Sequence, residues 1–306
     1  MVIRVRATVL LCALALLAGG CKSRPEPAGA DPPKKTGPPP LAPTARPYGL
    51  YVPAALDRSK AAPLVVFFHG YGSTGASSAR GFGLMGLADA HGFVLAYPDG
   101  TLDAQGRRFW NATNACCNFE NVDVDDVAYA AWILDDVASR TSIDRKRVYV
   151  AGHSNGGFMA MRLACDLAPR VAAAVSLAGA AWQDASQCNP SEPVSVLQIH
   201  GDADGIVHYG GGILFDKPAR AYPGAETTVA TWASKDHCAG PPVRTGATLD
   251  FDALLPGGET RIAQATGCPP GISVDLWTVG GGSHGPSPTP AGLDAMWSWM
   301  AAHPKR

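Results

Sequence analysis

The chain has 306 residues, of which 46% are hydrophobic and 17% are charged, so it is long enough to bury one large core. Its formal net charge at neutral pH is only -1. This balance argues against a nucleic-acid-binding surface and against a polybasic patch that would bind a membrane.

The first 45 residues are predicted to carry targeting information and a tether. Two arginines precede a short apolar run and a string of small residues, which is typical of a signal peptide over 1–21. Cys21 directly follows the small residues, as in bacterial lipoproteins, and is a candidate lipidation site; free secretion is the alternative. Residues 22–45 are dense in Pro and are predicted to form a disordered linker. A lipid on Cys21 is the one membrane contact that we expect.

The remainder, 46–306, is predicted to be a single catalytic domain. Continuous apolar runs, typical of buried parallel strands, alternate with helical stripes, and this pattern predicts an α/β fold with a mostly parallel sheet and helices on both faces. The expected strands are 48–53, 64–68, 93–97, 148–150, 171–177, 194–199 and 273–279. The expected helices are 84–91, 127–138, 158–168, 227–234 and 293–300. Residues 209–271 are rich in Gly and Pro and suggest a hairpin.

A strand, a G-x-S-x-G turn and a helix follow one another around Ser154, within residues 147–168. This is the context of a nucleophile elbow, which would leave Ser154 at the end of a parallel strand beside a helix N-terminus. Ser283 lies in a second G-x-S-x-G sequence, but prolines follow it and prevent a helix from starting there. Ser154 is therefore the candidate nucleophile. The alternative is a Gly-rich turn that only packs a helix against a strand.

A serine nucleophile needs a base and an orienting carboxylate, which follow in the order Ser, Asp or Glu, His in this type of fold. His284 comes after the last predicted strand and is the candidate base; otherwise it is an ordinary turn residue. Asp202 and Asp204 both follow the strand over 194–199, and spacing alone does not choose between them. The other aspartate is expected to be a turn residue that bonds its own backbone.

The oxyanion of an ester intermediate needs backbone N–H donors. One is expected from Asn155, directly after the nucleophile, and the other from Tyr71, in the Gly-rich loop after the first buried strand. His69 in the same loop is interpreted as a supporting or turn residue rather than as a base.

Six cysteines remain after residue 45, an even number that in an exported chain indicates disulfides. We expect Cys238 to pair with Cys268, because both flank the late Gly- and Pro-rich segment. No cysteine or histidine cluster has the spacing of a zinc site, so no metal is expected. The six are Cys116, Cys117, Cys165, Cys188, Cys238 and Cys268.

Together these motifs resemble the exported polyhydroxybutyrate depolymerase and feruloyl esterase group, carbohydrate esterase family 1. The resemblance spans nearly all of 46–303 and follows the family's order. It implies an α/β-hydrolase fold, an ester substrate and no cofactor, and it assigns the acid to Asp204. The similar segments are 51–53, 63–70, 97–100, 125–127, 152–157, His200-Gly201-x-x-Asp204 and the turn before His284.

The resemblance also implies one disulfide between the Cys116-Cys117 loop and Cys165, without saying which loop cysteine takes part. One departure concerns the substrate cleft. The family's tryptophan after the catalytic histidine is missing here, where Gly285 and Pro286 follow His284. Trp110 is a candidate to replace it as a substrate-binding wall, with a core or loop anchor as the alternative.

The sequence therefore predicts an exported serine esterase that acts on feruloyl or acetyl esters of polysaccharides or on short hydroxyalkanoate esters. Two alternatives remain open: a serine peptidase with the same triad, and a non-catalytic lipoprotein that binds a saccharide or polyester fragment. The intact triad positions count against the second alternative. Oligomeric state is not indicated.

Overall fold

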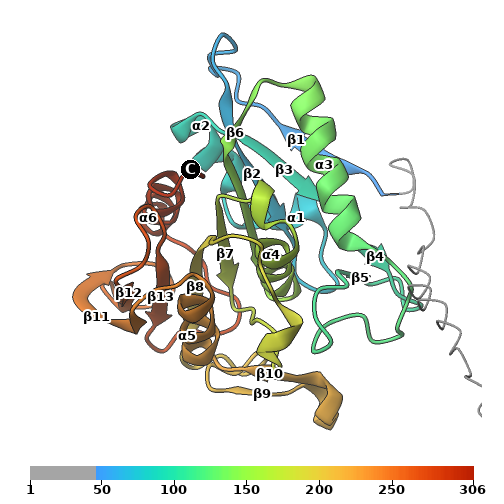
Figure 1. The fold of residues 1–306 in the computed structure, drawn as a ribbon. Coiled ribbons are helices and arrows are strands. Elements are labelled where there is room, and N and C mark those ends of the chain that lie inside the picture. The colour runs from blue at the N-terminus through green and yellow to red at the C-terminus, as the bar shows by residue number, and fades with distance from the viewer. Residues whose placement is uncertain (1–45) are drawn as a thin grey trace, which may run out of the picture. The chain divides into compact units, whose positions relative to one another are not determined.

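A computed structural model describes residues 46–306 (Figure 1). The predicted signal peptide, Cys21 and the linker over 22–45 lie outside the described residues. Within the described part of the chain, no helix is both long enough and apolar enough to cross a membrane.

A nine-stranded sheet forms the centre of the domain, in the spatial order β1-β3-β2-β6-β7-β8-β13-β12-β11. Its strands are β1 (Tyr48–Tyr51), β2 (Ala62–Phe68), β3 (Val94–Pro98), β6 (Ile143–His153), β7 (Ala173–Leu177), β8 (Ser195–Gly201), β11 (Gly240–Leu249), β12 (Thr260–Thr266) and β13 (Val274–Val279). Two hairpins lie outside it: β4 (Thr101–Leu102) with β5 (Arg108–Phe109), and β9 (Gly211–Ile213) with β10 (Ala221–Pro223).

The six central strands, from β3 to β13, pair in parallel, whereas β1, β12 and β11 add to the edges in antiparallel fashion. The predicted mostly parallel sheet is confirmed. All seven residues of β2 are buried, which explains why its sequence is a continuous apolar run rather than an alternating one. Because the parallel strands share one direction, their carboxyl ends and the loops that follow them gather at one edge of the sheet.

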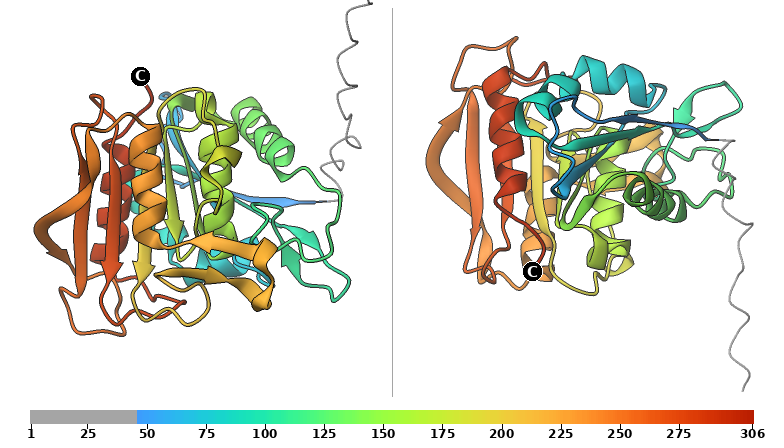
Figure 2. Two further views of the ribbon diagram at one scale, coloured as in Figure 1. Left: turned by 60° about the horizontal axis from the view of Figure 1, so that its bottom comes forward. Right: turned by 90° about the horizontal axis from the view of Figure 1, so that it is seen from above.

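Helices cover both faces of the sheet, as Figure 2 shows. One apolar cluster packs α3, α4 and α5 against one face, and a second packs α1, α2 and α6 against the other. The helices are α1 (Gly75–Gly81), α2 (Leu84–His91), α3 (Asp126–Arg140), α4 (Asn155–Asp166), α5 (Ala225–Lys235) and α6 (Pro290–Ala301). This two-layered cover is the predicted α/β-hydrolase architecture.

Local sequence signals account for several helix boundaries. The carboxylate of Asp125 accepts the N–H of Ala128 and caps α3, and the hydroxyl of Thr289 accepts the N–H of Gly292 and caps α6. Pro290 stands at the first position of α6, where its missing N–H leaves no bond unmade.

The late Gly- and Pro-rich segment differs most from the sequence-based expectation. The expected hairpin is present, and its strands β11 and β12 extend the central sheet beyond β13. Helix α1 was not expected, because its sequence, GASSARG, has no apolar stripe. It is held by Thr74, whose side chain caps its first turn.

Three disulfides join the six cysteines in pairs. Cys238 pairs with Cys268, as predicted. The predicted loop-to-helix bond is wrong, because Cys165 pairs with Cys188 and the two loop cysteines, Cys116 and Cys117, pair with each other. The chain after β7 passes over the end of α4 and brings Cys188 to a Cα–Cα distance of 5.7 Å from Cys165, within the usual disulfide range. Such bonds are typical of exported proteins.

Asp236, at the end of α5, gives the fold a testable pH dependence. Its side chain is buried and accepts the N–H of Val194, and burial raises its pKa from 3.8 to about 7. Between these two pH values the folded state keeps a proton that the unfolded chain has lost, so the free energy of unfolding falls as the pH rises. We expect Asp236→Asn to remove this fall and to stabilise the fold at pH 8 by on the order of 2 kcal/mol.

Denaturant unfolding at several pH values measures this effect. The matched control is Asp123→Asn, which changes an exposed carboxylate and should leave the pH dependence as it is in the wild type. The prediction would be contradicted if the free energy of unfolding fell equally steeply with pH in Asp236→Asn and in the wild type.

Candidate active site

Ser154 occupies the sharp turn between β6 and α4, with φ 55° and ψ -120°. This left-handed conformation is unusual for a residue other than glycine. Neighbouring glycines make room for it. A Cβ atom on Gly152 would lie 2.2 Å from the Gly156 oxygen, and one on Gly156 would lie 1.9 Å from the Phe68 oxygen. The turn therefore requires glycine at both positions, as a nucleophile elbow does.

Ser154, His284 and Asp204 form a continuous chain of hydrogen bonds. His284 Nε2 lies 2.9 Å from Ser154 Oγ, and His284 Nδ1 lies 2.8 Å from Asp204 Oδ2. The three side chains come from the turn after β6, the loop after β8 and the loop after β13, and the parallel sheet brings these loops together. With Asp204 ionised, the proton of His284 lies on Nδ1 and Nε2 is free to accept the serine hydroxyl.

The side chain of Asp204 is completely buried, which by itself would raise its pKa. Hydrogen bonds from His200 and His284 and from the N–H groups of Ile206 and Val207 outweigh burial, and they hold the pKa of Asp204 well below its usual range. Asp204 is therefore a carboxylate near neutral pH.

His200 contacts the carboxylate of Asp204. Its Nδ1 accepts a hydrogen bond from Gln198, 3.0 Å away, so the ring proton lies on Nε2. That Nε2 points at the Val207 oxygen, at 2.7 Å, and at Asp204 Oδ2, at 3.3 Å. In the Ser, Asp, His order of this fold His200 comes too early in the chain to be the base, so the sequence motifs assigned it no role. The one sequence signal for its contact with Asp204 is that it stands four residues before Asp204.

His153, between Gly152 and Ser154, contacts the catalytic series of hydrogen bonds at His284. Burial lowers its pKa to about 4, so the ring is neutral at physiological pH. Its Nε2 lies 2.7 Å from the backbone oxygen of His284 and donates to it. The ring also lies beside that of His284, with centroids 5.0 Å apart. Sequence reasoning missed this residue, because it stands at a variable position of the G-x-S-x-G motif.

Asp202 was expected to be the local turn residue of the aspartate pair, but it bonds across to the loop that carries His284. Its Oδ1 accepts the N–H of Gly281 at 2.6 Å, and its Oδ2 pairs with Arg261 at 2.8 Å. Backbone bonds from Asp202 to Val279 and from Ala203 to Gly282 run alongside. The loops that carry Asp204 and His284 are thus tied together directly.

The loop after β2 approaches Ser154 from the opposite side. A Cβ atom on Gly70 would lie 3.4 Å from the Cβ of Ser154, so the Gly70–Tyr71 peptide passes close to the serine. His69 holds this loop: its Nδ1 donates to the Gly70 oxygen at 2.7 Å, and its Nε2 accepts the N–H of Gly100 at 2.9 Å. Burial lowers the pKa of His69 to about 4, in keeping with a structural rather than a basic role.

Trp110 was a candidate wall of the substrate cleft, which would require part of its side chain to be exposed. The structure does not place it there. Its side chain has no exposed surface, and its Nε1 donates to the His69 oxygen at 3.0 Å. The side chain of Asn155 bonds both the N–H and the oxygen of Trp110, at 2.7 and 3.1 Å. Trp110 is therefore an anchor that fixes the two backbone segments bearing Tyr71 and Asn155, because a buried indole is held by packing and by its single donor.

No group of three or more His, Cys, Asp or Glu side chains among residues 46–306 is arranged to hold a metal ion. The site offers a hydroxyl, an imidazole and a buried carboxylate in series, with two backbone segments facing them. Such a set suits acyl transfer through a serine.

Comparison with known proteins identifies the family. The family model described as "Esterase PHB depolymerase" matches residues 46–229. The chain belongs to this esterase family. A feruloyl esterase B from Piromyces equi is 29% identical over 238 residues, which are 76% of this chain but 41% of that protein. A putative esterase, NocK, from Nocardia uniformis subsp. tsuyamanensis is 31% identical over 245 residues, 78% of this chain and 70% of that protein.

Among solved structures, an acetyl xylan esterase from Aspergillus awamori has a TM-score of 0.58 at 18% identity. The alignment covers 85% of this chain and 95% of that one. At this identity the likeness concerns the fold alone, and it supports the α/β-hydrolase architecture of the family.

The contacts of Asp202 lead to a prediction about positioning. Asp202→Ala removes the acceptor for Gly281 and the partner of Arg261, and we expect kcat for p-nitrophenyl acetate to fall about tenfold with little change in KM. Asp202→Asn keeps an acceptor for Gly281 and should lose less. Steady-state kinetics of both variants measure the effect, and wild-type kcat in Asp202→Ala would contradict it.

Proposed function

We propose that the chain is an exported serine esterase that hydrolyses carboxylic esters through an acyl-enzyme. The observation that carries the proposal is the unbroken series of hydrogen bonds from Ser154 Oγ through His284 to Asp204, at 2.9 and 2.8 Å. A serine hydroxyl is a weak nucleophile, and this series supplies both the base that activates it and the carboxylate that orients the base.

In the first half-reaction, Ser154 Oγ attacks the ester carbonyl carbon while His284 Nε2 takes the hydroxyl proton. Asp204, held ionised by its hydrogen bonds, stabilises the positive charge that develops on His284. The tetrahedral intermediate then collapses, the bond to the alcohol oxygen breaks, and His284 passes its proton to that oxygen. The acyl group remains on Ser154.

Two backbone N–H groups stabilise the negative oxygen of the intermediate. Asn155 offers one at the first turn of α4, where helix N–H groups have no partner within the helix. Tyr71 offers the other. The neighbouring N–H groups of Gly72 and Ser73 already bond Arg108 and Gly70, at 2.8 and 3.1 Å, whereas within residues 46–306 the Tyr71 N–H has no hydrogen-bond acceptor.

In the second half-reaction, a water molecule replaces the alcohol. His284 Nε2 takes a proton from the water as its oxygen attacks the acyl carbon, and then returns a proton to Ser154 Oγ as the acid leaves. The enzyme is restored without a metal or an organic cofactor.

The substrates that we propose are feruloyl or acetyl esters of polysaccharides or short hydroxyalkanoate esters. Their support is the family itself and the names of the relatives, one of which is a feruloyl esterase. The disulfides fit an oxidising, extracytoplasmic location. Export by the segment over 1–21, an anchor on Cys21 and a linker over 22–45 belong to the same proposal. The complete Ser-His-Asp geometry argues against a protein that only binds saccharide or polyester.

The two G-x-S-x-G sequences give a matched test of the nucleophile. We expect Ser154→Ala to lower kcat/KM for p-nitrophenyl acetate and butyrate by roughly 10⁴-fold or more, because within residues 46–306 no other hydroxyl hydrogen-bonds His284 Nε2. Ser283→Ala, in the rival motif, should turn over both esters at close to the wild-type rate. Wild-type turnover by Ser154→Ala would contradict the mechanism.

The two neighbouring aspartates give a test of the acid. Asp204→Asn keeps the shape of the side chain but favours the wrong tautomer of His284, so kcat should fall by about 10³–10⁴-fold. Asp202→Asn, two residues away, should lose far less, because Asp202 contacts the loop and not the ring. Comparable losses in the two variants would mean that the acid has been assigned wrongly.

A further inference from the structure

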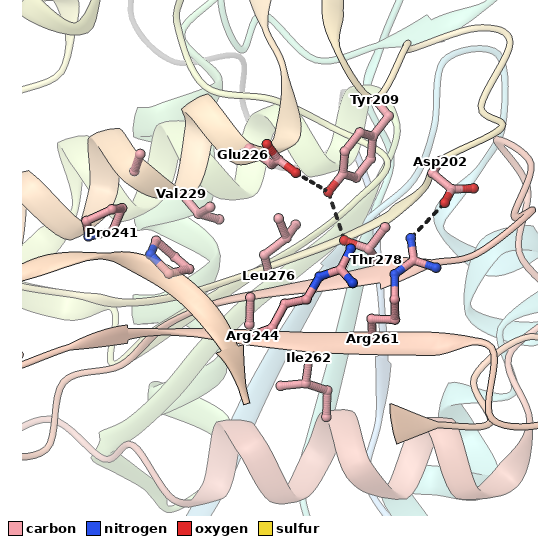
Figure 3. A pocket seen from close by; sticks show the side chains of 13 residues that line it. Asp202, Tyr209, Glu226, Val229, Pro241, Arg244, Arg261, Ile262, Leu276 and Thr278 are labelled. Atoms are coloured by element: carbon pink, nitrogen blue, oxygen red, sulfur yellow. Dashed lines mark hydrogen bonds and ion pairs between the residues drawn. The ribbon is translucent and has the colours of Figure 1, made fainter. Parts of the chain in front are cut away.

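A cavity lies between α5 and the part of the sheet that β11 and β12 add (Figure 3). It has a volume of about 430 Å³, and Ser154, Asp204 and His284 are not among the residues that line it. Helix α5 contacts β8, β13 and β11, so the cavity opens where the antiparallel strands extend the sheet past the helix. A volume of this size falls within the usual range of small-molecule sites.

Two arginines enter this cavity from neighbouring strands. Arg244 of β11 stands opposite Ala263 of β12, and Arg261 lies two residues before Ala263, so both arginines are on the same face of the sheet at diagonal positions. Figure 3 shows both side chains extending from the sheet into the cavity. Guanidinium groups placed in this way can both reach one carboxylate.

The two guanidinium groups differ in how far they are already satisfied. Arg261 is held by Asp202 at 2.8 Å, while its Nε is buried and has no hydrogen-bond partner. For Arg244, no ion pair is found with any carboxylate within residues 46–306. One arginine is thus fixed in place, and the other retains its full capacity to bind an anion.

Opposite the arginines the cavity carries groups that suit hydroxyls. The phenol oxygen of Tyr209 lies 2.8 Å from Thr278 Oγ1 and 3.4 Å from Glu226 Oε1, as the dashed lines in Figure 3 mark. Apolar side chains, among them Val229 and Leu276, complete the lining. The cavity therefore combines a cationic side, hydroxyl-binding groups and an apolar surface.

We propose that this cavity binds a sugar carboxylate, that is, a uronate residue. Arg244 and Arg261 take the carboxylate, Glu226 and Tyr209 take ring hydroxyls, and Val229 and Leu276 contact the C–H face of the ring. A phosphate monoester fits less well, because the carboxylates of Glu226 and Asp202 also line the cavity and would repel its second negative charge.

The site would let the proposed esterase bind the acidic branches of a polysaccharide through a cavity that the triad does not line. That biological use rests on the proposed function, whereas uronate binding itself does not. A variant that lacks Ser154 Oγ should bind uronate as the wild type does, so the two proposals can fail separately.

Titration of the whole chain with sodium glucuronate, followed by calorimetry or by NMR, tests the proposal. We expect glucuronate to bind and uncharged glucose to bind at least about tenfold more weakly, because glucose lacks the group that the arginines hold. Arg244→Gln should weaken glucuronate binding about tenfold or more. The matched control is Arg58→Gln, which changes an exposed arginine in the turn after β1 and should leave binding unchanged.

The uronate could be a free monosaccharide or a branch of a polysaccharide. An oligosaccharide with one uronate branch, compared with the same oligosaccharide without it, distinguishes these two sources. Binding of both free glucuronate and the branched oligosaccharide, or of the branched oligosaccharide alone, supports the site if Arg244→Gln weakens it. The proposal is overturned if neither binds, if glucose binds as well as glucuronate, or if Arg244→Gln binds like the wild type.

Discussion

The close approach of β2, β6 and α4 around Gly152 and Gly156 is the constraint on which the site depends. Any side chain at either glycine would overlap backbone atoms, at 2.2 Å from the Gly156 oxygen and 1.9 Å from the Phe68 oxygen. This approach forces Ser154 into the left-handed region and lifts its hydroxyl out of the strand. The strain is tolerated because the flanking strand and helix are both buried and cannot relax independently.

The remaining parts of the site are held by contacts between loops. Asp202 ties the loop of Asp204 to that of His284, His153 bonds the backbone of His284, and His200 bonds Asp204. A second set, centred on Trp110, joins the loop after β2 to the start of α4. Buried polar networks of this kind are stable only when their members are satisfied, and each bond then restricts the geometry of its neighbours. Preorganisation of the site follows from these bonds.

Much of the fold and the triad could be predicted from sequence because their signals are local. Apolar runs indicated the parallel strands, and the strand, glycine turn and helix around Ser154 indicated the elbow. The remainder depended on long-range contacts that leave no local signal. The burial of Trp110 follows from its bonds to His69 and Asn155, and the partner of Cys165 is set by how the chain after β7 crosses α4. Residue spacing predicts neither the burial of Trp110 nor the partner of Cys165.

We propose that Ser154, and not the serine of the rival motif, is the nucleophile of a working triad. The most direct measurement treats the whole chain with a fluorophosphonate and locates the adduct by peptide mass spectrometry. We expect one adduct, on the peptide that contains Ser154, and we expect Asp204→Asn to slow labelling strongly. An adduct on Ser283, or a chain that remains unlabelled, would contradict this proposal.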